Sequence, residues 1–382
     1  MKKNNNDILF IIPFSLYCFM SLSGGSRLIE LGNSVKIILY AIIILLFGIK
    51  IVISKLSIRE ICIYTIIGLV SAYAYIKLET IFFLMNFLAI ISLKNVDIRK
   101  VVKIDIAIKG IFLITHSTLY IIDYFFDYDN IEQFIINDGK RIRHAFYFTH
   151  PNIVNSMVFW MIMDILYLKQ NIKFKHILIS SIILGIMYEI TKSRTMLILF
   201  IIFLFIYYIG KIIKNKSLYY NIINTTQKFI IEFFTILSIA IGVLYKYNIR
   251  FITTFLNALT SGRVYYSYAA INDFGINFLC NAKAINLEKN LLLVDNFYIR
   301  CTVLYGLIFI LLIMIMTKLT KKDNKFMLDK IMFIILAISL FSEYFGIIIG
   351  NAIPLLLLGN MIINGDEKID KKNFLSLMKG KK

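Results

Sequence analysis

Arginine is used sparingly and selectively in this sequence. Lysine outnumbers arginine by 33 to 9, yet most arginines stand beside a few polar motifs instead of following the lysines. A guanidinium presents a rigid fork of donors that holds a phosphate through two hydrogen bonds, whereas a lysine ammonium acts only as a point charge. The arginines on the side of the apolar segments that carries fewer lysines are Arg27, Arg141, Arg143, Arg194, Arg250, Arg263 and Arg300. As a group, they predict a site for an anionic ligand.

A structural explanation competes with this one at every single position. A lone arginine beside a membrane also extends its side chain to the lipid headgroups, or pairs with an acidic residue. The acidic residues available on the same side are Asp127, Asp129, Glu189 and Asp273. The seven arginines taken together favour ligand binding over seven separate structural roles.

Four short motifs contain the arginines with the strongest chemical signal. In chain order they are Arg143-His144-Ala145-Phe146-Tyr147-Phe148-Thr149-His150-Pro151-Asn152, Thr191-Lys192-Ser193-Arg194-Thr195, Leu259-Thr260-Ser261-Gly262-Arg263 and Val294-Asp295-Asn296-Phe297-Tyr298-Ile299-Arg300. Each motif combines a cation with hydroxyl, amide, imidazole or carboxyl groups. Sets of this kind bind anions and transfer protons.

The composition places these motifs in a membrane protein. Hydrophobic residues make up 59% of the 382 residues, charged residues make up 17%, and the mean hydropathy is +0.77. Soluble domains contain about 45–50% apolar and about 25% charged residues, so water is not the main solvent of this chain. The net charge of +19 comes largely from lysines between apolar segments. It therefore indicates membrane topology and contact with lipid, and not a nucleic-acid partner.

Apolar windows near the length that crosses the roughly 30 Å hydrocarbon core of a bilayer recur along the chain. They cover residues 8–24, 34–54, 60–76, 78–93, 101–126, 152–170, 175–191, 195–212, 228–248, 299–318, 327–344 and 346–363. Lysine and arginine concentrate in alternate connections and in both terminal segments, which places both termini in the cytoplasm. The sequence predicts an all-α, polytopic membrane protein with about 12 transmembrane helices in a single domain, 1–382, whose first helix is retained.

Two of the connections predicted on the outer side are long, residues 127–151 and 249–298. Long connections in compact proteins are usually functional or disordered. The second is too rich in apolar and aromatic residues for a disordered tether, so we expect it to fold into short amphipathic helices on the membrane surface. The basic cytoplasmic tail, residues 364–382, is expected to lie against anionic lipid.

The order of the four motifs on a chain with twelve predicted spans resembles the O-antigen and capsular-polysaccharide polymerases of the Wzy-dependent pathway, which are related to the O-antigen ligases. The resemblance covers most of the chain from residue 100 onward. It implies a glycosyltransferase of the bacterial cytoplasmic (inner) membrane, with a GT-C-like architecture and an active site at the large outer loop. Two positions depart from the pattern. Glycine often stands where this sequence has Tyr147, and the ligases tend to carry histidine where it has Asp295.

The resemblance also implies a reaction. Such an enzyme transfers a growing glycan from undecaprenyl pyrophosphate to a new lipid-linked repeat at the outer face of the membrane. Pyrophosphate leaves as a stable anion, so the site needs positive charge to bind it, and no metal or other cofactor is implied. Asp295 is expected to accept the proton of the attacking hydroxyl. The residues expected to bind substrate are Arg143, His150, Arg194, Arg263, Tyr266, Asn296, Tyr298 and Arg300.

Simpler roles remain open for several of these residues. Asp295 is also placed to cap the helix that begins near residue 299, and His150 to bond backbone at the helix start beside Pro151. The D-x-D pattern at Asp127 and Asp129 would hold a divalent cation in a metal-dependent glycosyltransferase, although such pairs are commonly only solvated loops. The four histidines lack the spacing of zinc ligands.

Polar groups inside the predicted spans have structural interpretations. Asp105 and Lys109 stand four residues apart on one helix, where they neutralise each other. His116 has two interpretations of equal weight: a packed, hydrogen-bonded residue, or a relay for protons. Gly346 and Gly350 form a G-x-x-x-G pattern, which is typical of close helix packing.

Two other functions compete with polymerisation. A flippase for lipid-linked oligosaccharide would also present arginines to pyrophosphate, but it should show internal repeats and short loops. A ligase that attaches finished glycan to another acceptor shares most of the same motifs. The partners implied for a polymerase are undecaprenyl-pyrophosphate-linked oligosaccharide, membrane lipid, and chain-length regulator and flippase proteins.

Overall fold

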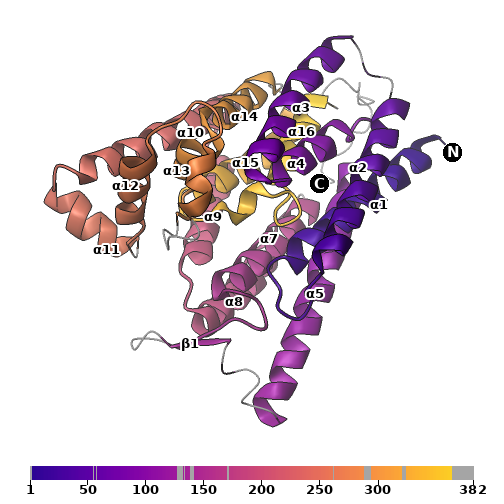
Figure 1. Cartoon of the computed structure of the whole chain (residues 1–382). Coiled ribbons are helices and arrows are strands. Elements are labelled where there is room, and N and C mark those ends of the chain that lie inside the picture. The colour runs from indigo at the N-terminus through magenta and orange to yellow at the C-terminus, as the bar shows by residue number, and fades with distance from the viewer. Residues whose placement is uncertain are drawn as a thin grey trace.

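The computed structural model describes residues 2–54, 56, 58–126, 132, 134–137, 142–169, 172–260, 262–287, 294–320 and 324–363. Helices dominate its regular structure (Figure 1). The first half contains α1 Lys2–Ser23, α2 Asn33–Ile53, α3 Ile58–Leu78, α4 Phe82–Ile91, α5 Ile98–Phe126, α7 Pro151–Lys169, α8 Phe174–Thr191 and α9 Thr195–Ile212. The second half contains α10 Lys216–Tyr245, η1 Phe251–Leu256, α11 Asn257–Leu259, α12 Arg263–Phe274, η2 Ala282–Leu287, α13 Phe297–Arg300, η3 Cys301–Tyr305, α14 Leu307–Leu319, η4 Asn324–Phe326, α15 Met327–Ser339, η5 Tyr344–Ile347 and α16 Pro354–Ile363. Strands β1 Ile135–Asn137 and β2 Ile142–His144 pair antiparallel.

Long apolar helices confirm an all-α membrane protein. Among the described residues, α1, α2, α5, α7, α8, α9 and α10 are long and apolar enough to cross a bilayer. Their outer surfaces are apolar as well: Ile37 and Val52 of α2 are 68% and 83% exposed, and Phe205 of α9 is 65% exposed. Surface this apolar requires lipid and not water to cover it.

Several of the other helices are too short to cross a bilayer alone. Each of the twelve predicted windows contains all or part of a described helix, but α4, α15 and α16 have only 10, 13 and 10 residues. At 1.5 Å per residue such helices reach about 15–20 Å, against roughly 30 Å of hydrocarbon. The number of crossings therefore stays a prediction.

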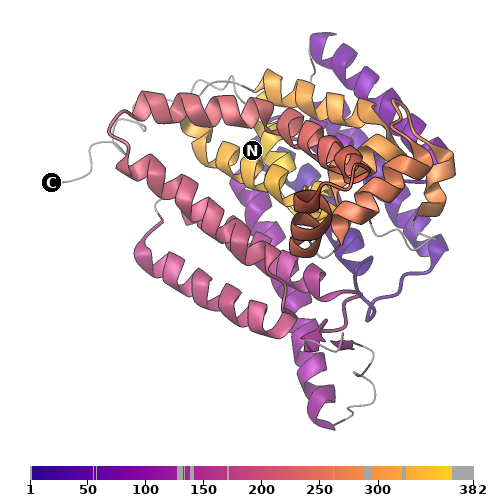
Figure 2. The same cartoon turned by 90° about the vertical axis from the view of Figure 1, so that its left-hand side faces the viewer.

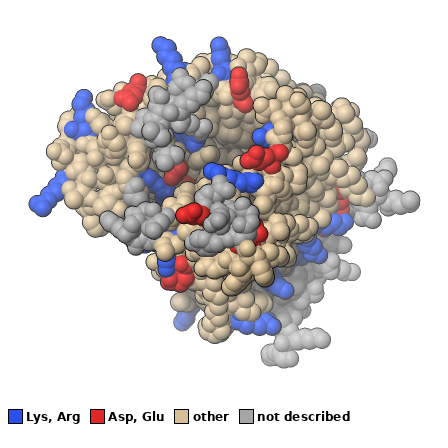
Figure 3. Space-filling model, turned by 60° about the horizontal axis from the view of Figure 1, so that its bottom comes forward, with Lys and Arg blue, Asp and Glu red and all other residues tan. Residues whose placement is uncertain are grey.

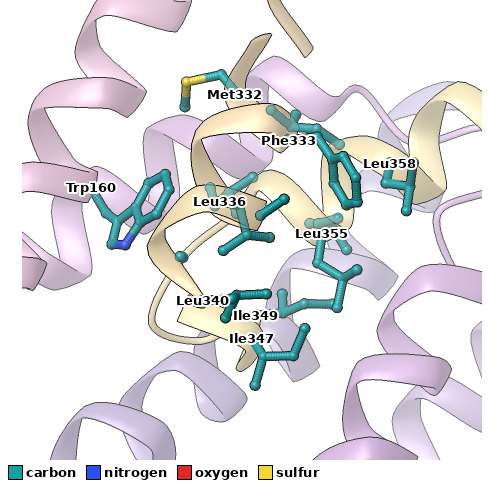
Figure 4. Close-up of a cluster of buried hydrophobic side chains, with 14 of the residues drawn as sticks. Trp160, Met332, Phe333, Leu336, Leu340, Ile347, Ile349, Leu355 and Leu358 are labelled. Atoms are coloured by element: carbon teal, nitrogen blue, oxygen red, sulfur yellow. The ribbon is translucent and has the colours of Figure 1, made fainter. Parts of the chain in front are cut away.

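Helix α15 lies at the centre of the bundle, packed against α7, α9, α10 and α16. Its side chains Phe333 and Leu336 lie among apolar residues of the neighbouring segments, and Trp160 of α7 faces the same helix (Figure 4). Gly346 permits this packing, because an added Cβ would lie 2.8 Å from a methyl carbon of Leu336. Gly350 likewise faces Ser21 of α1, so both glycines serve close packing, although Gly346 lies in the short 3-10 helix η5 and Gly350 in the turn after it.

The predicted outer connections contact one another. The Arg27 amide donates to the Tyr147 carbonyl oxygen at 2.8 Å, and the Thr149 amide donates to the Gly25 carbonyl oxygen at 2.9 Å. The predicted cytoplasmic connections also meet, because Lys100 pairs with Asp7 at 2.6 Å. In both cartoon views the β1–β2 hairpin and the end of α5 project from the same end of the molecule (Figures 1 and 2). The sidedness of these connections, predicted from lysine and arginine, stays a prediction.

The large connection 249–298 forms short helices, as its composition predicts. Gly262 lies at φ 85° immediately before α12, a conformation that glycine adopts without steric cost. Gly306, at φ 93°, lets the chain turn into α14 against the backbone of Leu279. Helix α12 packs against α10.

Sidedness can be measured directly with single cysteines in a background without the native four. Cysteine at Ile142 or Asn272, both exposed, is expected to react with a membrane-impermeant thiol reagent in intact cells. Cysteine at the exposed Lys214 should react only after the membrane is permeabilised, because lysine-rich connections stay in the cytoplasm. The reverse pattern of labelling would overturn the topology.

Candidate functional site

Arg143 of β2 is held by two helix ends. Its Nε donates to the carbonyl oxygen of Thr191 at 2.9 Å, and its Nη2 donates to Oδ1 of Asn152 at 2.7 Å. Thr191 ends α8 and Asn152 lies in the first turn of α7, so the first two motifs meet here. The face that carries the β1–β2 hairpin has acidic and basic side chains lying beside one another near its middle (Figure 3).

Arg263, the first residue of α12, brings the third and fourth motifs together. Its Nε and Nη2 both lie 3.1 Å from Oδ2 of Asp295, so the guanidinium pairs with an acidic residue, which is the structural role expected as the alternative to phosphate binding. Its side chain is 22% exposed, and that of Asp295 is 32% exposed. Both side chains are therefore partly accessible at the surface of the protein, although they are paired with each other.

Asp295 does not cap the following helix. Asn296 does so, because its Oδ1 accepts from the amides of Tyr298 at 2.9 Å and Ile299 at 3.2 Å. The capping explanation offered for Asp295 is thus wrong, and its carboxylate faces Arg263 instead. Burial raises the pKa of Asp295, and the nearby Arg263 opposes that rise.

Glu343, which the sequence analysis does not single out, joins the two arginine groups. It follows α15 and is 3% exposed. Its Oε1 accepts from Nδ2 of Asn152 at 3.0 Å and lies 3.8 Å from Nη2 of Arg263. The contacts thus run without a break from Arg143 through Asn152 and Glu343 to Arg263 and Asp295. A carboxylate at the outer end of a predicted span is a signal that could have identified it.

His150 lies beside both arginines. Its Nδ1 accepts from the amide of Asn152 at 3.1 Å, which confirms the expected backbone bond at the start of α7. Burial, Arg143 and Arg263 lower the pKa of His150 to about 4. The ring is therefore neutral near pH 7, and its Nδ1 is occupied as an acceptor.

The remaining predicted substrate-binding residues lie outside this network. Arg194 is exposed at the start of α9, and Tyr266 is half-buried one turn after Gly262. Tyr298 is fully buried and its hydroxyl donates to the Ala337 carbonyl oxygen at 2.7 Å. Arg300 is also buried, with its guanidinium 4.0 Å from the ring centre of Tyr344. Their roles in binding stay predictions.

A small cavity of about 40 Å³, with a largely apolar surface, adjoins Arg263. Its polar lining residues are Ser238, Thr260, Arg263, Ser267, Asn296 and Ser342. Ser238 and Asn296 hydrogen bond to each other at 3.1 Å across its wall. Hydroxyl and amide groups of this kind can hydrogen bond to the hydroxyls of a bound ligand.

The turn before His150 keeps a glycine-like backbone although it contains tyrosine. Phe146 and Tyr147 have φ values of 48° and 60°, a conformation that costs non-glycine residues free energy. Side-chain contacts hold it in place: the Tyr147 hydroxyl donates to Asp123, and the ring packs edge-on against Phe134. These side-chain contacts therefore stabilise a left-handed backbone at Phe146 and Tyr147.

Metal binding has no further support within the described parts of the chain. No group of three or more histidine, cysteine, aspartate or glutamate residues there could hold a metal ion. The D-x-D pattern at Asp127 and Asp129 lies outside the described residues, as do Arg141, Ser261 and the basic tail.

Comparison with known proteins identifies no relative: no family model, curated protein or solved structure matches this chain.

Proposed function

We propose that this protein joins lipid-linked oligosaccharide repeats into a bacterial surface polysaccharide at the outer face of the cytoplasmic membrane. The observation that carries the proposal is the network formed by Arg143, Asn152, Glu343, Arg263 and Asp295, which places two guanidiniums and two carboxyl groups in one site. Transfer of a sugar from a pyrophosphate requires a cationic binding site and a proton acceptor, and both kinds of group occur here.

The proposed substrate is an undecaprenyl-pyrophosphate-linked oligosaccharide. The guanidiniums of Arg143 and Arg263 would hold the pyrophosphate and stabilise it as it leaves. Asp295 would accept the proton as the acceptor hydroxyl attacks the sugar carbon, and the hydroxyl and amide groups at the cavity beside Arg263 would bind sugar hydroxyls. The sugar–pyrophosphate bond breaks as the new glycosidic bond forms, so the charge that develops on the leaving group meets preformed donors. A GT-C-like architecture and about twelve crossings belong to the same proposal.

The carboxyl groups favour an enzyme over a flippase. A protein that only moves pyrophosphate across the membrane needs cations along its path, but it has no use for a carboxylate beside them, because this weakens anion binding. Here Asp295 and Glu343 both lie within 4 Å of Arg263. A ligase would use the same groups, and its product would differ in the acceptor.

Arg263→Lys is expected to remove most polymer while keeping the positive charge. A lysine ammonium cannot reproduce the fork of donors of a guanidinium, and losing a charge-assisted hydrogen bond costs about 1.5–3 kcal/mol, which corresponds to roughly 10- to 100-fold in rate. The measurement is the length distribution of lipid-linked glycan made by variants in cells that lack the chromosomal gene. Single repeats should accumulate.

The matched control is Arg99→Lys, which makes the same change at an exposed arginine of α5 on the predicted cytoplasmic side. It should support polymer of normal length. Normal polymer in Arg263→Lys would remove the arginine fork from the mechanism. Purified protein that moves lipid-linked repeats between bilayer leaflets without joining them would replace the polymerase proposal with a flippase.

A further inference from the structure

Glu343 lies at the centre of the arginine network, yet only one of its two carboxylate oxygens receives a hydrogen bond from the residues that the structure describes. Its Oε1 receives a hydrogen bond from Asn152 and lies 3.8 Å from Arg263, whereas its Oε2 is buried and has no hydrogen-bond partner among the described residues. An ionised carboxylate can only accept hydrogen bonds, and leaving one of its oxygens buried without a donor is costly. Protonation changes that oxygen into a donor.

The surroundings of Glu343 bring its pKa close to neutral, so both the protonated and the ionised form are populated near pH 7. Burial raises the pKa of Glu343 to about 7; the charge of Asp295 adds to the rise, while Arg263 and Arg143 oppose it. These opposing influences make the carboxyl responsive to any new charge placed beside it.

Arg263, Asp295 and Arg143 act on this carboxyl, and other charged or titratable groups lie close by. Arg143 belongs to β2, Arg263 to α12, Asp295 precedes α13, and His150 precedes α7. Arg300 of α13 lies on the ring of Tyr344, the next residue in the chain. His150 is neutral near pH 7 and Asp295 is bonded directly to Arg263, so the half-satisfied Glu343 is the group best placed to change its charge.

We propose that Glu343 is a positioning residue that takes up one proton when a prenyl pyrophosphate binds between Arg143 and Arg263. The two arginines and two carboxylates of the free site sum to zero charge. Adding one proton to Glu343 leaves a net charge of +1, which suits an anion. The arriving phosphate charges repel the carboxylate and so favour its protonated form, whose hydroxyl then donates to the ligand.

This inference rests on the anion-binding half of the proposed function and adds a proton balance to it. The proton enters from solvent on binding and is released when the anion leaves, so no covalent step is involved. Binding should consequently weaken as the pH rises above the pKa of Glu343, because more of the site must first be protonated.

The test is titration calorimetry of the purified full chain with geranylgeranyl pyrophosphate at pH 8, in two buffers that differ in heat of ionisation. The dependence of the observed heat on the buffer gives the number of protons taken up. The ligand's own protons contribute equally in Glu343→Gln, so the difference between wild type and this variant belongs to Glu343. A group with a pKa of about 7 is mostly ionised at pH 8, so the wild type should take up roughly 0.5–1 proton more.

Glu30→Gln is the matched control, since Glu30 is exposed and takes no part in the network. It should take up as many protons as the wild type. Equal proton uptake by wild type and Glu343→Gln, with both binding, would overturn the inference and leave the anion site standing. A wild-type protein that does not bind the ligand would overturn both.

Infrared difference spectroscopy covers the case in which Glu343→Gln does not fold. Adding geranylgeranyl pyrophosphate to the wild-type protein at pH 8 should produce the carbonyl band of a protonated carboxylic acid. The band should persist in Asp295→Asn, which retains Glu343. Absence of the band in the wild type, or its loss in Asp295→Asn, would refute the assignment to Glu343.

Discussion

Asp295→Asn is expected to lower the rate of glycosyl transfer by about 10²–10⁴-fold, the usual contribution of a general base. The asparagine oxygen can still accept a hydrogen bond from Arg263, but the amide cannot accept the proton of the attacking hydroxyl. Its fold should be intact, because Asn296 and not Asp295 caps α13. The measurement is the initial rate of polymer formation by purified enzyme supplied with lipid-linked repeats.

Asn296→Ala supplies the contrast for this prediction. It removes the cap that binds the amides of Tyr298 and Ile299, so it should lower stability by about 0.5–2 kcal/mol, whatever it does to the binding of sugar. Asp295→Asn should leave the unfolding temperature near that of the wild type. A near-normal transfer rate in Asp295→Asn would reduce Asp295 to a partner that holds Arg263.

The same assay separates the arginine site from a metal site. If the guanidiniums supply the positive charge, excess EDTA should leave the purified enzyme active. Activity that is lost with EDTA and restored by Mn²⁺ or Mg²⁺ would transfer the chemistry to Asp127 and Asp129. Retained activity of Asp295→Asn under the same conditions would strengthen that conclusion.

The sequence predicts membrane helices well because lipid imposes a simple rule on them. A helix that faces hydrocarbon must be apolar over most of its length, and windows such as 34–54 and 195–212 meet this condition and form α2 and α9. The rule is weaker for helices surrounded by protein. Helix α15 ends at Ser339, before the end of its window 327–344. Residues 340–342 of that window form a turn instead, and Glu343 follows it.

The site could be predicted only in part, because motifs describe local chemistry and not distances across the fold. Arg143 and Arg263 were identified by their residue type and motifs, and the structure brings them to the same network. Glu343 belongs to no motif, since it reaches the site only through the packing of α15 behind Asn152. Tyr298 stands in a motif, yet its hydroxyl is used by the backbone of α15.

Charged side chains inside the predicted spans are stabilised by pairing with one another, because the interior of a membrane protein has a low dielectric constant. Lys109 of α5 is fully buried and pairs with Asp105 one turn earlier, as the spacing predicts. It also lies 3.2 Å from Asp164 of α7, a partner that the local spacing could not reveal. One lysine therefore holds two carboxyl groups and joins two helices inside the membrane.

Lys109→Met is expected to lower the free energy of unfolding by about 3–5 kcal/mol, the usual cost of removing one partner from a buried ion pair. Methionine fills much of the volume of the lysine stem, so the loss comes from the two carboxyl groups left without their cation. Lys103→Met is the control on the same helix, because Lys103 is exposed, and it should change stability by no more than about 0.5 kcal/mol. Stability is measured by thermal or denaturant unfolding of the purified protein in mixed micelles.

A triple variant decides whether pairing is the cause. Replacing Asp105 and Asp164 by leucine together with Lys109→Met removes every charge of the cluster and leaves apolar side chains between α5 and α7. Such replacements are often neutral or stabilising, so the triple variant should recover most of the stability lost by Lys109→Met. A triple variant as unstable as the single one would mean that the shape of these side chains, and not their charge, holds α5 against α7. A stable Lys109→Met would show that the lysine contributes no net pairing energy, because the two aspartates would then tolerate its absence by binding protons themselves.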